Sequence, residues 1–365
     1  MSNRSIKNAP VVRLPPKSTG EAALAQAAQA SLVVVGVVAG VFALYAAEYV
    51  LAPVALGIVI GLMLGPVATR LERRGVSPAL SAAAVVLFFL TIVCAFAAAI
   101  ATPLAAWIGR VPQIWSELQL QLSEWRQPLE ALRHAREQIR EVAGAADVTV
   151  SVEDGSAVEN MAVLAPAVIA QVLVFFASLY FFVATRNQTR TAILAICIDR
   201  RLRWRVAHIF RDVERMVSRY LLSITAINLV EGAAVGVALF ALGVPSAALW
   251  GALAALTNFI VYIGPFAMTV ILFAVGLAEF DTFAGSLMPP LVYLAINAVE
   301  AQFVTPMVIG RTMTLNPFMV LLALVFWIWL WGPLGGFIAI PALLIALAIV
   351  RNLLPGFKRA ERGPA

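Results

Sequence analysis

The chain has 365 residues, of which 62% are hydrophobic and only 13% are charged, and its mean hydropathy is +0.91. A soluble domain carries about 25% charged residues, so this composition excludes an ordinary soluble protein and predicts an all-α protein that crosses the membrane several times. The net charge of +6 does not indicate nucleic-acid binding, because the basic residues cluster between apolar segments, where they set membrane topology.

The first part of the chain is predicted to contain a basic arm and three membrane spans. Residues 1–30 form the arm, which lacks the features of a secretory signal and is expected to be disordered. Residues 31–103 contain the spans, at about Ser31–Ala47, Val50–Thr69 and Ala79–Pro103. Each approaches the ~20 residues that a membrane-crossing helix needs. Arg70, Arg73 and Arg74 follow the second span, which is typical of a cytoplasmic loop.

Residues 104–160 change in character from apolar to amphipathic. They contain 5 Arg against 9 Asp and Glu, a net charge of −4. Val111, Trp115, Leu118 and Leu122 recur at spacings of three and four, the stripe of an amphipathic helix. An acidic segment between basic ones belongs outside, so we expect an extracytoplasmic helical insertion.

Residues 161–351 contain the remaining spans, beginning with a fourth at about Ala162–Ala184. Residues 186–219 then hold nine Arg against three acidic residues, a net charge of +6. We expect a cytoplasmic amphipathic helix over 197–219 that binds anionic lipid headgroups; phosphate-bearing ligands are the alternative. A basic tail, residues 352–365, is expected on the same side.

A short pattern occurs twice in this region. Asn228-x-x-Glu231 recurs sixty-nine residues later as Asn297-x-x-Glu300, and a Pro-led apolar segment and then a Gly-Pro pair follow each copy. Three segments per copy is an odd number, which predicts an internal inverted repeat. That is the layout of many secondary transporters, with the binding site near the midplane. The alternative is a chance coincidence of short motifs.

The Gly-Pro pairs are predicted to break membrane helices. Residues 318–350 would measure about 50 Å as one helix, well beyond a hydrocarbon core of ~30 Å. Residues 246–280 are either two crossings or a re-entrant hairpin. Proline lacks an amide hydrogen, and the freed backbone groups are tolerated at membrane depth only inside protein or beside water. The predicted hinge residues are Gly264, Pro265, Gly332, Pro333, Gly335 and Gly336.

Glu231 and Glu300 are the two carboxylates placed deep within predicted spans. Such residues usually face a pathway or a partner, because burying a charge in the membrane is costly. Positions three apart share a helix face, so Asn228 and Asn297 lie beside the two glutamates. The predicted pathway residues are Asn228, Glu231, Asn258, Tyr262, Asn297 and Glu300.

A structural role for the glutamates is the competing interpretation. Each could bond free backbone amides of a broken helix, or pair with Arg219 or Arg311 as a brace. No hydrolase elbow, phosphate-binding loop or HExxH motif is present. The two cysteines and two histidines have no metal or redox spacing. We therefore expect no enzyme activity, no cofactor and no metal.

Several longer motifs resemble those of one family. They are Leu51-Ala52-Pro53 through Leu64-Gly65-Pro66, Leu242-Gly243-Val244-Pro245, Phe259-Ile260-Val261-Tyr262-Ile263-Gly264-Pro265, Thr305-Pro306-Met307-Val308-Ile309-Gly310, and Trp331-Gly332-Pro333-Leu334-Gly335-Gly336. Together they make the chain similar to the autoinducer-2 exporter family, also described as PerM-type permeases. The family commonly has Pro where this chain has Val261, a difference that bears on local rigidity.

The resemblance implies about eight membrane segments, a homo-oligomer that is a pentamer, and export of a small polar solute. Some relatives are linked to autoinducer-2 and others to cation/proton exchange. We therefore expect a secondary transporter in the bacterial inner membrane, with both termini cytoplasmic, coupled to a proton or sodium gradient. The alternatives are a cation/proton antiporter, a passive channel, or a membrane scaffold that transports nothing.

Overall fold

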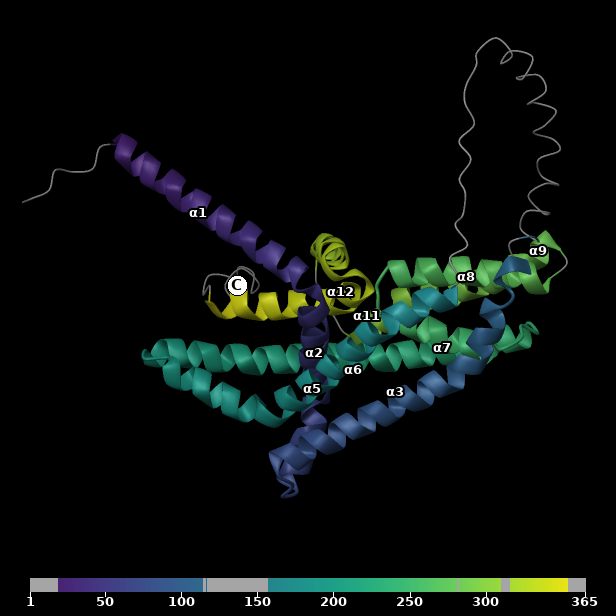
Figure 1. The fold of residues 1–365 in the computed structure, drawn as a ribbon, viewed down its shortest axis with the longest axis horizontal. Helices are drawn as coiled ribbons and strands as arrows, with labels where there is room; N and C mark the ends of the chain where they lie inside the picture. The colour runs from purple at the N-terminus through teal and green to yellow at the C-terminus, as the bar shows by residue number, and fades with distance from the viewer. Residues whose placement is uncertain (1–18, 114–115, 117–156, 281, 310–315, 354–365) are drawn as a thin grey trace, which may run out of the picture. The chain divides into compact units, whose positions relative to one another are not determined.

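The computed structural model describes residues 19–113, 116, 157–280, 282–309 and 316–353, and all of its regular structure is helical (Figure 1). The helices are α1 (Thr19–Ala46), α2 (Glu48–Arg73), α3 (Pro78–Ile108), α5 (Ala157–Ile196), α6 (Arg200–Ala241), α7 (Ala247–Thr257), α8 (Ile263–Glu279), α9 (Phe283–Ser286), α10 (Met288–Val299), a π-helix (Glu300–Val304), α11 (Thr305–Ile309) and α12 (Pro317–Leu353). The predicted acidic insertion helix, the basic arm up to residue 18 and the tail from residue 354 lie outside these ranges.

Seven helices in the described part of the chain are long and apolar enough to cross a membrane. Helices α7 and α8 are shorter, at 11 and 17 residues. Eleven residues span only about 17 Å, roughly half of the hydrocarbon core, so α7 is too short to cross the membrane by itself. The prediction of an all-α, multi-pass membrane protein with about eight membrane segments is confirmed.

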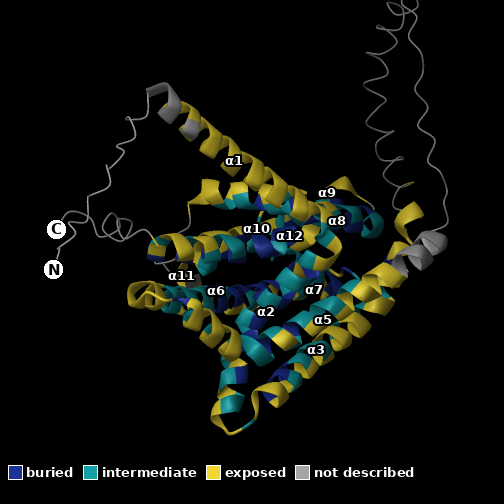
Figure 2. Cartoon of the chain, turned by 60° about the vertical axis from the view of Figure 1, so that its left-hand side comes forward, coloured by how far each residue is buried: buried dark blue, intermediate teal, exposed yellow. Residues whose placement is uncertain are grey.

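The chain divides into two compact units, residues 1–48 and 49–365. In the first, α1 exposes its apolar side chains along its length, from Leu32 to Phe42 (Figure 2). The second unit contains the remaining helices, and its buried residues concentrate on α2, α6, α7, α8 and the second half of α12.

Helices α2, α3 and α5 pack around a small apolar core that includes Leu64, Ala68 and Leu179. Gly57 and Gly61 of α2 face α5, where an added methyl group would meet the backbone of Phe175 or the ring of Phe182 within 3.0 Å. These glycines let the two helices approach closely. Close packing stabilises helix pairs in a membrane, where the lipid is as apolar as the side chains and the hydrophobic effect does not bring helices together.

The second core joins α6, α7, α8 and α10. Gly232 of α6 and Gly251 of α7 lie in contact, because a methyl group on either would come within 2.5 Å of the other's carbonyl oxygen. The buried apolar members of this core are Trp107, Val235, Leu239, Val244, Ala247, Leu249, Trp250, Ala254, Met268, Leu272, Val275 and Tyr293. This core fixes the α7–α8 hairpin against α6.

Helix α6 differs from the prediction. The arginine-rich stretch is not a separate interfacial helix but the first half of one helix of 42 residues that continues as the fifth span. No Gly or Pro interrupts it before Gly232. The stretch also contacts protein, since α6 packs on α5 and α12 and Val217 is fully buried. Its apolar stripe is therefore partly covered by the protein itself.

Three polar contacts show which segments lie together at each end of the second unit. Arg110 and Glu279 form an ion pair of 2.6 Å at one end of the second unit. At the other end, Arg186 pairs with Glu72 at 3.0 Å. Asn352 donates to Asp212 over 2.9 Å, which joins the end of α12 to α6. These contacts agree with the predicted grouping of the loops on two sides.

Candidate functional site

The first helix break lies just before the predicted Gly-Pro pair. Helix α7 ends at Thr257 and α8 begins at Ile263, so the chain turns over residues 258–262. Gly264 and Pro265 are the second and third residues of α8. Proline is tolerated there because the first four amide groups of a helix have no intrahelical partner. The prediction of a break was right, but its placement at Gly264-Pro265 was late by a few residues.

The second break lies inside α12, at the predicted place. Trp331 has φ −136° and ψ 23°, and Gly332 has φ 57° and ψ −141°. Only glycine adopts the latter conformation readily. Pro333 starts the second half of α12, where its missing amide hydrogen leaves no helical bond unmade.

The same close contact stabilises both breaks. A methyl group on Gly264 would lie 1.9 Å from the carbonyl oxygen of Thr257, and one on Gly335 would lie 1.8 Å from that of Trp327. In each case a glycine of the second half-helix rests on the backbone of the first. This shared geometry supports the internal repeat, whose inverted orientation stays a prediction.

Glu231 lies at the centre of a buried polar cluster. One carboxylate oxygen accepts a hydrogen bond of 3.0 Å from the Nδ2 of Asn297 on α10. The other accepts a short hydrogen bond from the Nδ2 of Asn258, the residue that ends α7. That Nδ2 also donates to the Oδ1 of Asn228 over 3.1 Å. Four of the six predicted pathway residues therefore meet at one point, where α6, α10 and the α7–α8 turn converge.

Glu300 occupies a second unusual piece of backbone. It opens the π-helix Glu300–Val304, a form that often marks a functional site. Its carboxylate accepts a short hydrogen bond from the hydroxyl of Thr305. Pro306 provides a physical reason for the widened turn, because its ring would clash with the carbonyl of residue 302 in a regular α-helix.

Both glutamates line one cleft of about 400 Å³ between α6 and α10. The rest of the lining is apolar and consists of Ile227, Val230, Ala234, Ala295, Ile296, Val299 and Val304. Glu231 and Glu300 are 3% and 9% exposed. The two glutamates of the repeated motif thus border one apolar space, while their carboxylate oxygens are buried in hydrogen bonds to Asn258, Asn297 and Thr305.

Two buried polar groups at this place have no hydrogen-bond partner among the described residues. They are the Nδ2 of Asn228 and the hydroxyl of Tyr293, which is fully buried on α10. Tyr293 lies four residues before Asn297 and seven before Glu300, so it shares their helix face. That spacing could have singled out Tyr293 from the sequence.

Tyr262 does not join the cluster. Its side chain is 57% exposed, and its φ of 67° places it in the left-handed region, which is unusual for a bulky residue. The predicted brace also takes another form, since Glu231 bonds two side-chain amides, and among the described residues it forms no ion pair with Arg219. Arg311 lies outside the described residues. The sequence spacing of Asn258 and Thr305 does not predict their hydrogen bonds to Glu231 and Glu300.

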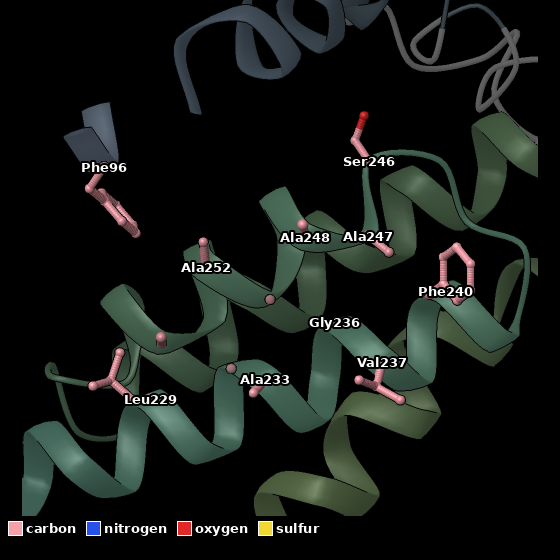
Figure 3. Close-up of a pocket in the computed structure, with 13 residues that line it drawn as sticks. Phe96, Leu229, Ala233, Gly236, Val237, Phe240, Ser246, Ala247, Ala248 and Ala252 are labelled. Atoms are coloured by element: carbon pink, nitrogen blue, oxygen red, sulfur yellow. The ribbon is translucent and has the colours of Figure 1, made fainter. Parts of the chain in front are cut away.

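The opposite stripe of α6 lines an apolar groove of about 700 Å³ (Figure 3). Leu229, Gly236, Val237 and Phe240 border it from α6, α7 contributes alanines, and Phe96 faces them from α3. It contains no charged side chain, so in the second half of α6 the carboxylate of Glu231 lies on a different stripe from this groove.

The fold and the cluster define a multi-pass membrane protein with two broken helices and a buried carboxylate at one of the breaks, the architecture of a membrane transporter. A family model described as AI-2E family transporter matches residues 34–355. The chain belongs to this family, which confirms the resemblance read from its motifs.

Individual relatives share part of the sequence. The chain is 36% identical over 129 residues to the AI-2 transport protein TqsA of Escherichia coli K12, a match that covers 35% of this chain and only 37% of TqsA. It is 27% identical over 320 residues to "Putative transport protein MT0215" of Mycobacterium tuberculosis, covering 85% and 84% of the two chains. The "Putative transport protein YueF" of Bacillus subtilis is 27% identical over 154 residues, which cover 42% of this chain and 41% of YueF.

Proposed function

We propose that the protein is a secondary transporter that exports a small polar solute across the bacterial inner membrane, with autoinducer-2 or a related molecule as the solute. The observation that carries the proposal is the cleft of about 400 Å³ between α6 and α10, which both Glu231 and Glu300 line. The two carboxylates are buried at the wall of this apolar space, and a polar solute would contact them once the cleft opens.

Coupling to a proton or sodium gradient is part of the proposal. Glu231 is held by the amides of Asn258 and Asn297, which are neutral. A carboxylate without a cationic partner can take up a proton or a sodium ion as the cleft opens and closes, because nothing on the protein competes for its charge. The breaks at residues 258–262 and at Gly332 provide the hinges.

The same observation favours one alternative, a cation/proton antiporter, in which the cation rather than a polar solute occupies the cleft. Under both proposals the chain assembles as a homo-oligomer, a pentamer by family resemblance, with a pathway in each subunit and cytoplasmic termini. Anionic lipid is the expected partner of residues 197–219.

The test is flux into proteoliposomes that contain the purified protein, with an imposed pH or sodium gradient and a panel of solutes that includes autoinducer-2. Wild-type protein should show saturable, gradient-dependent flux. Glu231→Gln and Glu300→Gln should each reduce the flux at least about tenfold. This corresponds to a rise of ~1.4 kcal/mol or more in the activation free energy of transport.

Glu279→Gln is the matched control, because Glu279 also makes a side-chain contact but lies at the end of α8, away from the cleft. It should keep wild-type flux. Flux of a metal cation alone would select the antiporter. Folded, oligomeric protein without gradient-dependent flux of any of these species would refute both proposals and leave the glutamates a structural role.

A further inference from the structure

Tyr293 is a fully buried residue of α10 whose hydroxyl has no hydrogen-bond partner among the described residues. Burying a hydroxyl without a partner destabilises a fold, because the group loses its bonds to water and gains none in return. Phenylalanine would fill nearly the same space without this cost. The stability of the fold therefore does not explain why a tyrosine occupies this position.

Tyr293 and Asn228 lie on opposite sides of Glu231 along α6. Tyr293 belongs to the apolar core that contains Val235 and Leu239, and both of these residues follow Glu231 on α6. Asn228 precedes Glu231 by about one helical turn, and in the part of the chain that the structure describes its Nδ2 has no partner either. The carboxylate is thus flanked by an unused hydroxyl on one side and an unused amide donor on the other.

The helix face of Tyr293 is the one that meets the carboxylates. Asn297 follows Tyr293 by four residues and donates to Glu231 over 3.0 Å, and Glu300 follows Tyr293 by seven residues. The hydroxyl lies within electrostatic range of both carboxylates, and its interaction with Glu231 is the larger of the two. Glu231 is therefore the carboxylate to which Tyr293 is linked.

Tyr293 is not among the residues that line the glutamate cleft of about 400 Å³. From α10, Ile296 and Val299 border that cleft, whereas Tyr293 belongs to the core that α10 shares with α6, α7 and α8. Glu231 belongs to both surroundings, because it lines the cleft and also bonds to Asn297 on the face of Tyr293. A species that reached Glu231 from Tyr293 would stay inside the protein and would not enter the cleft.

Few titratable groups surround Tyr293. Helices α7 and α9 contain none, α10 contains no other, and α8 contains only Glu279, which pairs with Arg110 where α8 ends. The charged groups that act on the hydroxyl are Glu231 of α6 and Glu300 of the π-helix. A proton that leaves the hydroxyl for a side chain of these elements therefore goes to a glutamate.

We propose that Tyr293 passes protons to Glu231 along a route inside the protein, separate from the cleft that admits the solute. A hydroxyl suits this role because it donates one hydrogen and accepts through its lone pairs. As the hydroxyl proton moves to the carboxylate, the oxygen takes up a second proton that enters from the predicted extracytoplasmic side. Tyr293 is then again a neutral hydroxyl, and Glu231 is a neutral carboxylic acid. The proposal rests on the proposed function, since the route matters only if transport is coupled to a proton gradient.

The experiment compares two modes of transport by the purified protein in proteoliposomes, with autoinducer-2 as the solute. One mode is accumulation driven by an imposed pH gradient. The other is exchange of labelled for unlabelled solute at equal pH on both sides, which needs no net proton movement. The variant is Tyr293→Phe, which removes only the hydroxyl. The matched control is Tyr180→Phe, which removes a hydroxyl at the core of α2, α3 and α5.

We expect Tyr293→Phe to lower pH-driven accumulation about tenfold and to keep exchange within about twofold of wild type. Its midpoint of thermal unfolding in detergent should equal that of wild type or exceed it, because the substitution removes a buried polar group that has no partner. Tyr180→Phe should keep both modes of transport.

Wild-type accumulation by Tyr293→Phe would overturn the proton route and leave the proposed function intact. Equal losses of accumulation and exchange would assign the hydroxyl to the solute or to the fold and would also overturn the route. So would a lowered unfolding midpoint, which would reveal a stabilising partner of the hydroxyl. Wild-type protein that exchanges the solute without responding to the pH gradient would refute proton coupling and this route with it. Wild-type protein with neither mode would refute the proposed function itself.

Discussion

Asn258 joins the end of α7 to α6 through one amide group. Both hydrogens of its Nδ2 are used, one toward Asn228 and one toward Glu231, and the residue is 7% exposed where α7 ends. Asn297 completes the arrangement from α10. A carboxylate placed at a helix break in this way can hold the break closed in one state and release it in another, which unites the pathway and brace interpretations of the sequence.

Replacing Asn258 with alanine should destabilise the protein by about 2 kcal/mol, because it leaves one buried carboxylate oxygen of Glu231 and the Oδ1 of Asn228 without the hydrogen bonds described here. The measurement is the midpoint of thermal unfolding in detergent. The matched control is Asn187→Ala, which removes an exposed amide that contacts Glu72 over 3.4 Å and should change stability little. Equal effects of the two substitutions would contradict the central role of Asn258.

At the scale of elements, each broken helix is a pair of half-helices held together by a glycine that touches backbone. Gly264 against Thr257 and Gly335 against Trp327 are the tightest such contacts in the described residues. No side chain can be accommodated there without separating the half-helices, so both breaks depend on these glycines more than on the neighbouring prolines.

Gly264→Ala and Gly335→Ala should therefore each destabilise the fold by at least about 2 kcal/mol, since overpacking against backbone cannot be relieved by a rotamer change. Thermal unfolding and size-exclusion chromatography check this. Gly40→Ala serves as the control, because a methyl group there meets nothing within 4 Å and favours the helix. Wild-type stability in both break variants would rule out the close packing described here.

The sequence predicted the helical spans and the breaks well because these depend on local properties. Apolar length predicts a span, and Gly-Pro predicts a break. The position of the first break was harder, because Gly264 and Pro265 suit both a break and the first turn of a helix. The extent of α6 was missed because an amphipathic stripe looks alike whether lipid or protein covers it. The bonds of Glu231 to Asn258 and Asn297 depend on tertiary packing, which no spacing encodes.

At the scale of the molecule, polar contacts divide the loops between two faces. Arg110 and Glu279 mark one face, and Arg186, Glu72 and the Asn352–Asp212 contact mark the other. By the positive-inside rule, the excess of arginine in 186–219 predicts that the second face is cytoplasmic.

Thiol labelling in intact cells tests this assignment. In a background of Cys94→Ser and Cys197→Ser, we expect a membrane-impermeant maleimide to label Gln113→Cys from outside, and Gln188→Cys only after lysis. Both positions are exposed glutamines, so their reactivities are comparable. The reverse pattern would invert the orientation, and labelling of both from one side would contradict the single crossing of α5 between them.

The unbroken length of α6 has a mechanical consequence. With 42 residues it measures about 63 Å, with the glutamate cleft towards its carboxyl-terminal end and Arg200, Arg201 and Arg205 at its start. Trp204 lies 27 residues before Glu231, about 40 Å along the rod, so a tilt of about 5° about the cleft displaces the far end by about 3.5 Å. A small tilt of α6 at the carboxylates thus produces a displacement at the other end of the helix that is large enough to change its contacts there.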